Sequence, residues 1–81
     1  MNNTHMTQRE FEASLKVGDR VCVRWRQGMG PGVIAEVHQK SFNVELSSAI
    51  GKYPPGSIVR VNRVASARWS AGSCVRPEAA G

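Results

Sequence analysis

Residues 17–64 alternate between apolar and polar side chains over short runs, and glycine and proline separate these runs. In residues 19–26 the pattern is strict from Arg20 onward: Val21, Val23 and Trp25 alternate with Arg20, Cys22, Arg24 and Arg26. A period of two is typical of a β-strand that buries one face. Similar runs occupy residues 32–39, 42–47 and 57–61. The sequence therefore predicts an all-β fold, a small barrel of about five antiparallel strands, with residues 64–69 forming a last short strand or a helical turn.

The alternation also assigns side chains to the two faces of the sheet. We expect the odd-numbered valines and Trp25 to face the core, and the even-numbered cationic residues to face outward. In residues 32–39 this places Val33, Ala35 and Val37 on one side, and Ile34, Glu36 and His38 on the other. Residues 27–32, which are rich in glycine, are predicted to be a flexible loop.

The chain of 81 residues is long enough for one domain with one small core. Thr7 and Glu10 fit a capping box, and Phe11 and Leu15 follow at helical spacing, so a short N-terminal helix is predicted. We expect residues 1–6 to be disordered, residues 7–69 to form the barrel domain with its helical turn, and residues 70–81 to be a flexible C-terminal tail.

The formal net charge is +5, which favours phosphate-rich or otherwise acidic partners. Cys22 and Cys74 are the only cysteines, and their spacing does not indicate a disulfide scaffold or a zinc site. Glu36 and His38 share a strand face, with Glu45 as a neighbour in some registers, and we interpret them as surface groups rather than catalytic ones. No catalytic, cofactor-binding or metal-binding residues are predicted, and we expect a cytoplasmic protein without a membrane partner.

Several short segments resemble those of SH3-like small barrels. They are Val-Gly-Asp-Arg-Val at residues 17–21, the glycine-rich segment, Gly-Val-Ile-Ala-Glu-Val at 32–37, Val-Glu-Leu at 44–46 and Pro-Gly-Ser-Ile-Val-Arg-Val at 55–61. Their order is similar to that of KOW and Tudor-like domains. The resemblance implies a bent, five-stranded sheet whose loops and open face bind nucleic acid or peptide.

A second resemblance is to the plasmid-borne type II dihydrofolate reductases, which are SH3-like barrels of this length. Gly-Asp-Arg-Val at residues 18–21, Gly-Ser-Ile-Val at 56–59 and Val-Ala at 64–65 carry it. The resemblance implies a tetramer whose pore binds folate and NADPH through a Val-Gln-Ile-Tyr segment and a lysine. Residues 58–61 (Ile-Val-Arg-Val) and Val23 occupy the matching positions, so the glutamine, the tyrosine and the lysine are absent. These absences argue against reductase activity, and we predict no cofactor. A pore-type oxidoreductase is kept as a further alternative function, and self-association stays open.

The function that the residues favour is binding of nucleic acid through backbone phosphates. The predicted contact residues are arginines of the first and fourth strands together with one tryptophan: Arg20, Arg24, Arg26, Arg60, Arg63 and Trp69. We expect a bent sheet to bring both groups of arginines to one surface. An alternative is a protein-interaction barrel that binds an acidic peptide or a second copy of itself, with Ile34, Ile58 and Tyr53 as apolar contacts.

Overall fold

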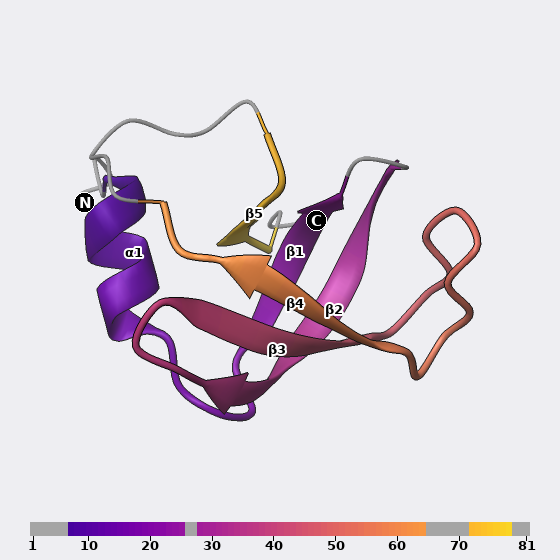
Figure 1. Ribbon diagram of the computed structural model, residues 1–81, viewed down its shortest axis with the longest axis horizontal. Coiled ribbons are helices and arrows are strands. Elements are labelled where there is room, and N and C mark those ends of the chain that lie inside the picture. The colour runs from indigo at the N-terminus through magenta and orange to yellow at the C-terminus, as the bar shows by residue number, and fades with distance from the viewer. Residues whose placement is uncertain (1–6, 26–27, 65–71, 79–81) are drawn as a thin grey trace.

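The computed structural model describes residues 7–25, 28–64 and 72–78 of the chain. The described residues form one helix and five strands: α1 (Gln8–Ser14), β1 (Arg20–Trp25), β2 (Gly28–Val37), β3 (Ser41–Leu46), β4 (Ile58–Asn62) and β5 (Cys74–Pro77) (Figure 1). The strands form one antiparallel sheet in the order β4-β3-β2-β1-β5. The predicted all-β fold of five antiparallel strands with a short N-terminal helix is confirmed.

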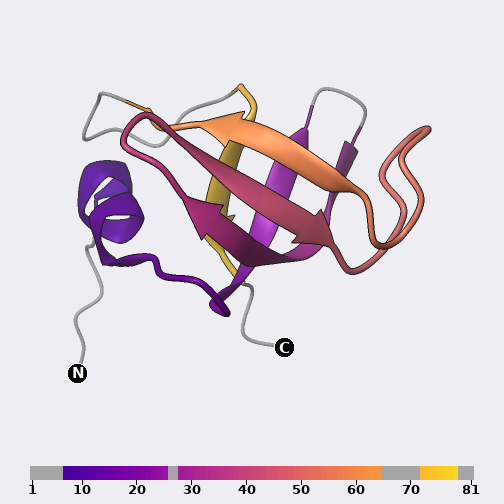
Figure 2. The ribbon, with the colours of Figure 1, turned by 60° about the horizontal axis from the view of Figure 1, so that its bottom comes forward.

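The sheet curls into a half-barrel. Figures 1 and 2 show β3 and β4 crossing over β1 and β5, while β2 runs along both halves. The core lies between the two halves and consists of buried apolar side chains from every element: Phe11, Leu15, Val21, Val23, Ile34, Phe42, Val44, Leu46, Ile50, Val59, Val61 and Val75. The outer faces of the two halves consequently point away from each other.

The side chains predicted to face the core do so in β1, but in β2 the prediction is wrong. Val21 and Val23 are fully buried, and Trp25 is partly buried against the core, as expected. In β2, however, Ile34 is buried, whereas Val33 is half-buried and Val37 is exposed. The register between β2 and β3 shifts between Ile34 and Glu36, which is a bulge that breaks the period of two. Ile34 is therefore a core residue and is not available as a surface contact.

The glycine-rich segment is not a loop as predicted. Residues 28–32 are the first half of β2 and pair with β1, so that Gly30 lies opposite Val23 and Gly32 opposite Val21. A Cβ atom at Gly32 would lie 2.7 Å from Cγ1 of Val44 and 3.1 Å from Cγ2 of Val23. Glycine is thus required there because the two halves of the sheet approach each other closely.

Helix α1 begins with the predicted capping box. The Thr7 hydroxyl accepts a hydrogen bond from the Glu10 N–H at 3.1 Å, and the Glu10 carboxylate accepts one from the Thr7 N–H at 2.9 Å. Phe11 and Leu15 join the core. Gln8 and Glu12 are also buried, and Nε2 of Gln8 donates to Glu12 Oε2 at 2.9 Å and to the carbonyl of Val75 at 3.1 Å. A polar contact therefore connects α1 to β5.

The fifth strand lies further along the chain than expected. Cys74–Pro77 forms β5 and pairs with β1, and both Cys74 and Val75 are fully buried, so this part of residues 70–81 is not a flexible tail as predicted. The residues 65–69 predicted as the last strand or turn lie outside the described residues, as do residues 1–6. Within the described part of the chain, no helix is both long and apolar enough to cross a membrane.

Candidate nucleic-acid interface

Strand β1 presents two of the predicted arginines on its outer face. Arg20 and Arg24 alternate with the buried Val21 and Val23, so both side chains leave the sheet on the side opposite the core. Four residues of an extended strand span about 13 Å. The Cα atoms of Arg20 and Arg24 are therefore about 13 Å apart along the same strand.

Strand β5 adds a third arginine that sequence reasoning missed. Cys22 lies opposite Arg76 in the antiparallel register, and directly opposite residues share a face. Arg76 therefore lies on the neighbouring strand, about 5 Å from Cys22. Along the strands, its position falls between those of Arg20 and Arg24. We call the outer surface formed by Arg20, Arg24 and Arg76 the basic face. The sequence signal for placing Arg76 on a strand is the alternation Cys-Val-Arg at residues 74–76, which contains one valine and is short for a strand.

Apolar surface lies next to the basic face. Met29 is opposite Arg24 and is 62% exposed, and Pro31 is opposite Cys22. A cavity of about 280 Å³ lies along these strands, lined by Val21, Cys22, Met29, Gly30, Pro31 and Glu78. A ligand with both anionic groups and flat apolar groups matches this combination of surfaces.

One carboxylate lies beside the basic face. Oε1 of Glu78 is 3.4 Å from Nε of Arg20, and the side chains of Arg20 and Glu78 are 74% and 40% exposed. This ion pair neutralises part of the positive charge at the Arg20 end. An exposed pair of this kind contributes little to stability, so a polyanion can compete for Arg20.

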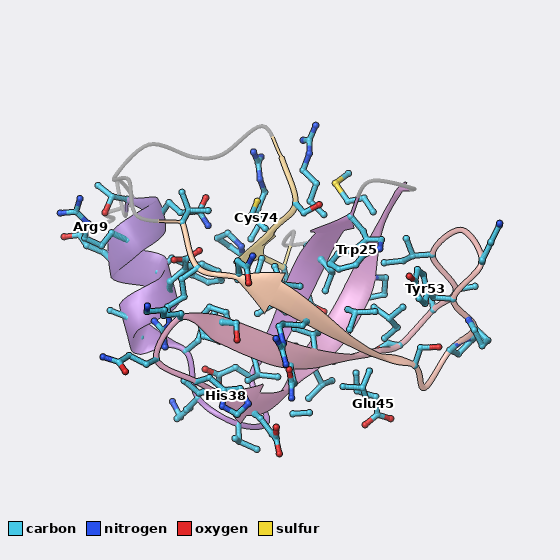
Figure 3. All side chains as sticks on the ribbon, viewed as in Figure 1. Arg9, Trp25, His38, Glu45, Tyr53 and Cys74 are labelled. Atoms are coloured by element: carbon cyan, nitrogen blue, oxygen red, sulfur yellow. The ribbon has the colours of Figure 1, made fainter. Side chains whose placement is uncertain are left out.

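Two aromatic residues lie at the Arg24 end of β1. The rings of Trp25 and Tyr53 meet edge to face, with centroids 6.2 Å apart and planes at 89° (Figure 3). Trp25 also lines a cavity of about 310 Å³ with Arg24, Gly28 and Met29. Trp25 thus packs against the core, as predicted, and part of its side chain is also accessible at the surface beside Arg24.

Arg60 does not join the basic face. It projects from the outer side of β4, opposite Asn43 of β3, and is therefore on the half of the sheet that faces away from Arg24 and Arg76. Its surroundings are polar rather than cationic. Oε1 of Glu36 accepts hydrogen bonds from Nδ2 of Asn43 at 2.6 Å and pairs with Nε2 of His38 at 3.0 Å.

The contacts around Glu36 also change its acidity. The hydrogen bonds from His38 and Asn43, followed by the charge of protonated His38, hold the pKa of Glu36 below its ordinary value of 4.5. Glu45 lies elsewhere along β3, opposite Val33 and Ile58, and Figure 3 shows it well separated from His38. The three groups considered for acid–base chemistry are therefore not brought together.

Arg63 is held by the protein itself. Its guanidinium lies over the ring of Phe42, with the carbon 4.4 Å from the ring centroid. Its Nε donates to the carbonyl of His38 at 3.0 Å, and Nη1 donates to the carbonyl of Glu12 at 3.4 Å. These contacts lie beside α1 rather than on the basic face. Arg26 and Trp69, the remaining predicted contact residues, lie outside the described residues.

Both cysteines are free thiols. Cys22 lies opposite Arg76, and the fully buried Cys74 lies opposite Arg24, so the two cysteines are diagonal rather than direct neighbours on the same side of β1 and β5. Diagonal positions are about 7 Å apart, which is beyond the usual reach of a disulfide. Among the residues that the structure describes, no three His, Cys, Asp or Glu side chains group together as metal ligands.

No family model, no curated protein and no solved structure matches this chain.

Proposed function

We propose that this protein binds nucleic acid along the basic face, through contacts of Arg20, Arg24 and Arg76 with backbone phosphates. The observation that supports this most directly is the register that sets three arginines, of which Arg76 is half-buried, on the same side of two adjacent strands. Arginine forks match phosphate oxygens well, and each phosphate neutralised releases counterions. Arg60 and Arg63 are not part of this proposal, because one lies on the other half of the sheet and the other is held by protein groups.

The proposed binding is independent of base sequence. Helix α1 has seven residues, of which Gln8, Phe11 and Glu12 are buried, so it offers no recognition helix for a major groove. The apolar surface at Met29 and the nearby ring of Trp25 favour single strands, whose unstacked bases can contact such groups. We infer an SH3-like class of barrel, in keeping with the strand order and the single long strand shared by both halves.

The test is a fluorescence-anisotropy titration of labelled single- and double-stranded DNA and RNA at two salt concentrations. We expect affinity to fall with salt and single strands to bind more tightly. Arg24→Gln should reduce the salt slope by about one unit, the loss of one phosphate contact. Arg60→Gln removes the same charge from the opposite side of the molecule and should leave the slope nearly unchanged.

Three outcomes would contradict the proposal. Negligible binding of every oligonucleotide at low salt would exclude nucleic acid as the ligand. Equal effects of Arg24→Gln and Arg60→Gln would show that net charge alone causes the binding, without a localised interface. An acidic peptide that competes with the oligonucleotide, with the tighter affinity of the two, would reassign the basic face to a protein partner.

A second candidate function is self-association through β4. The hydrogen bonds from Leu46 to Ser57 and from Arg63 to Lys40 show that odd-numbered residues of this strand bond to β3. The backbone groups of Ile58, Arg60 and Asn62 therefore point toward the free edge of the sheet. Ile58 is 55% exposed on this strand. Sedimentation at several concentrations tests this candidate: a dimer that Ile58→Asp converts to monomer supports it, and a monomer at all concentrations contradicts it.

A further inference from the structure

A second polar surface lies between α1 and the turn that joins β2 to β3. Figures 1 and 2 both show α1 beside this turn and beside the end of β4. A cleft of about 480 Å³ occupies this place and is lined by residues of all three segments: Arg9, Glu12, Ala13, Gln39, Lys40, Arg63 and Val64. This volume is large enough for a small molecule.

Arg63 lies at the wall of this cleft, and its contacts with the protein use only some of its N–H donors. A guanidinium group has five N–H donors. The hydrogen bonds to the carbonyls of His38 and Glu12 use one N–H of Nε and one of Nη1, and the stacking on Phe42 holds the plane in place. Three N–H donors of Arg63 therefore have no acceptor among the described residues. Since the side chain is already ordered, binding of an anion costs little conformational entropy.

The cleft carries an excess of positive charge. Lys40, in the β2–β3 turn, and Arg9, on α1, line it together with Arg63. Among the described residues of the lining, Glu12 is the one that carries a carboxylate. Both oxygens of this carboxylate accept the Val64 N–H, and Oε2 also accepts from Gln8, so they are engaged by protein groups. Lys40 and Arg63 give the described lining two cations against this one engaged carboxylate, and this excess of positive charge is complementary to an anion.

We propose that this cleft binds the phosphate group of a small molecule, such as a phosphate monoester, with Arg63 as the directional donor and Lys40 as a second cation. A tetrahedral dianion presents several oxygens to the fixed guanidinium, and charge-assisted hydrogen bonds of this kind are strong. This site is separate from the basic face, because its residues lie at α1 and the β2–β3 turn. The proposal does not depend on nucleic-acid binding.

The experiment titrates the full chain with inorganic phosphate, and then with adenosine monophosphate, at constant ionic strength, and follows backbone amide shifts by NMR. We expect saturable shifts at Ala13, Lys40 and Val64. Lys40→Glu should weaken binding by about tenfold or more, the value of one charge-assisted hydrogen bond. Lys52→Glu makes the same charge change in the exposed loop between β3 and β4, on the far side of the sheet from α1, and should change affinity by less than about twofold.

Arg63→Lys tests the directional role of the guanidinium. It keeps the charge but loses the fork, so we expect weaker phosphate binding, and the amide spectrum of the free variant shows whether the fold is intact. Shifts that do not saturate, or equal effects of Lys40→Glu and Lys52→Glu, would overturn the proposal. An Arg63→Lys variant that is folded and binds phosphate as tightly as the original protein would overturn the role given to Arg63.

A further set of measurements distinguishes a small molecule from a nucleic-acid backbone as the source of the phosphate. If the site is separate, Arg24→Gln leaves the phosphate shifts unchanged, and Lys40→Glu leaves oligonucleotide affinity within about twofold. Displacement of bound phosphate by a single-stranded oligonucleotide would overturn the small-molecule proposal and assign the cleft to nucleic acid. Failure of all oligonucleotides to bind would contradict the function proposed for the basic face and would leave the phosphate titration as an independent result.

Discussion

The backbone N–H of Val64 donates to both carboxylate oxygens of Glu12, at 3.0 Å and 3.1 Å. This contact joins α1 to the end of β4 across 52 residues of sequence. Oε2 of Glu12 also accepts from Gln8, whose amide donates to Val75 of β5. Glu12 is only 3% exposed and Gln8 is fully buried, so this buried polar pair connects the helix to both edges of the half-barrel.

Replacing Glu12 should destabilise the protein. Glu12→Ala leaves the Val64 N–H and one donor of Gln8 without this buried acceptor, and we expect the free energy of unfolding to fall by about 1–3 kcal/mol. Glu12→Gln retains one oxygen acceptor and should have a smaller effect. Urea denaturation measures both. Glu45→Ala, at an exposed position of β3, should change stability by less than about 0.5 kcal/mol, and an equal loss in both alanine variants would contradict the role of Glu12.

Gly32 should not tolerate a side chain. A Cβ atom there would lie 2.7 Å from Val44 Cγ1 and 3.1 Å from the carbonyl oxygen of Glu45, and the branched valine has little freedom to move away. We expect Gly32→Ala to lower the free energy of unfolding by about 1–3 kcal/mol. Gly30→Ala is the matched comparison: among the described residues its Cβ would meet the side chain of Ile50, at 3.2 Å, and no backbone atom, so its effect should be smaller. Equal stability of Gly32→Ala and the original protein would show that the two halves of the sheet are not in close contact.

The acidity of Glu36 should depend on His38 more than on Asn43. The pKa of Glu36 is held below 4.5, chiefly by the hydrogen bond with His38 and then by that from Asn43. Because the pKa is lower in the folded state, the ionised carboxylate favours folding above pH 4.5, and this contribution is lost as the pH falls through the folded-state pKa. NMR titration of the Glu36 side chain should show a larger upward shift in His38→Ala than in Asn43→Ala. The reverse order would contradict the assignment.

The sequence predicts elements well where local chemistry and tertiary structure agree. Thr7 and Glu10 form the capping box that their spacing indicates, and β1 buries Val21 and Val23 as its alternation requires. In both cases the deciding contacts lie within a few residues of the chain or follow from one buried face. The same alternation predicts that Arg20 and Arg24 leave the sheet on the side opposite Val21 and Val23, and the structure places them there.

The errors arise where distant contacts decide the structure. Glycine and proline in residues 28–32 indicate a loop by local rules, but strand β2 needs glycine where Val23 and Val44 approach. The bulge between Ile34 and Glu36 changes which residues face the core: Ile34, before it, faces inward, whereas Val37, after it, lies opposite the buried Phe42. No composition signal marks this change. Strand β5 has four residues, and its pairing depends on the edge of β1, so Arg76 was not identified as a neighbour of Cys22.

Removing Glu78 should strengthen nucleic-acid binding if the basic face is the interface. Glu78 pairs with Arg20 at 3.4 Å, so a phosphate must compete with it for this guanidinium. Surface ion pairs are worth about 0.2–1 kcal/mol, and Glu78→Gln should therefore raise affinity at low salt by roughly 1.5- to 5-fold. Glu36→Gln removes the same charge from the other half of the sheet and should have little effect in the anisotropy titration. A gain of equal size in both variants would indicate that total charge controls binding, and no gain in Glu78→Gln would place Arg20 outside the interface.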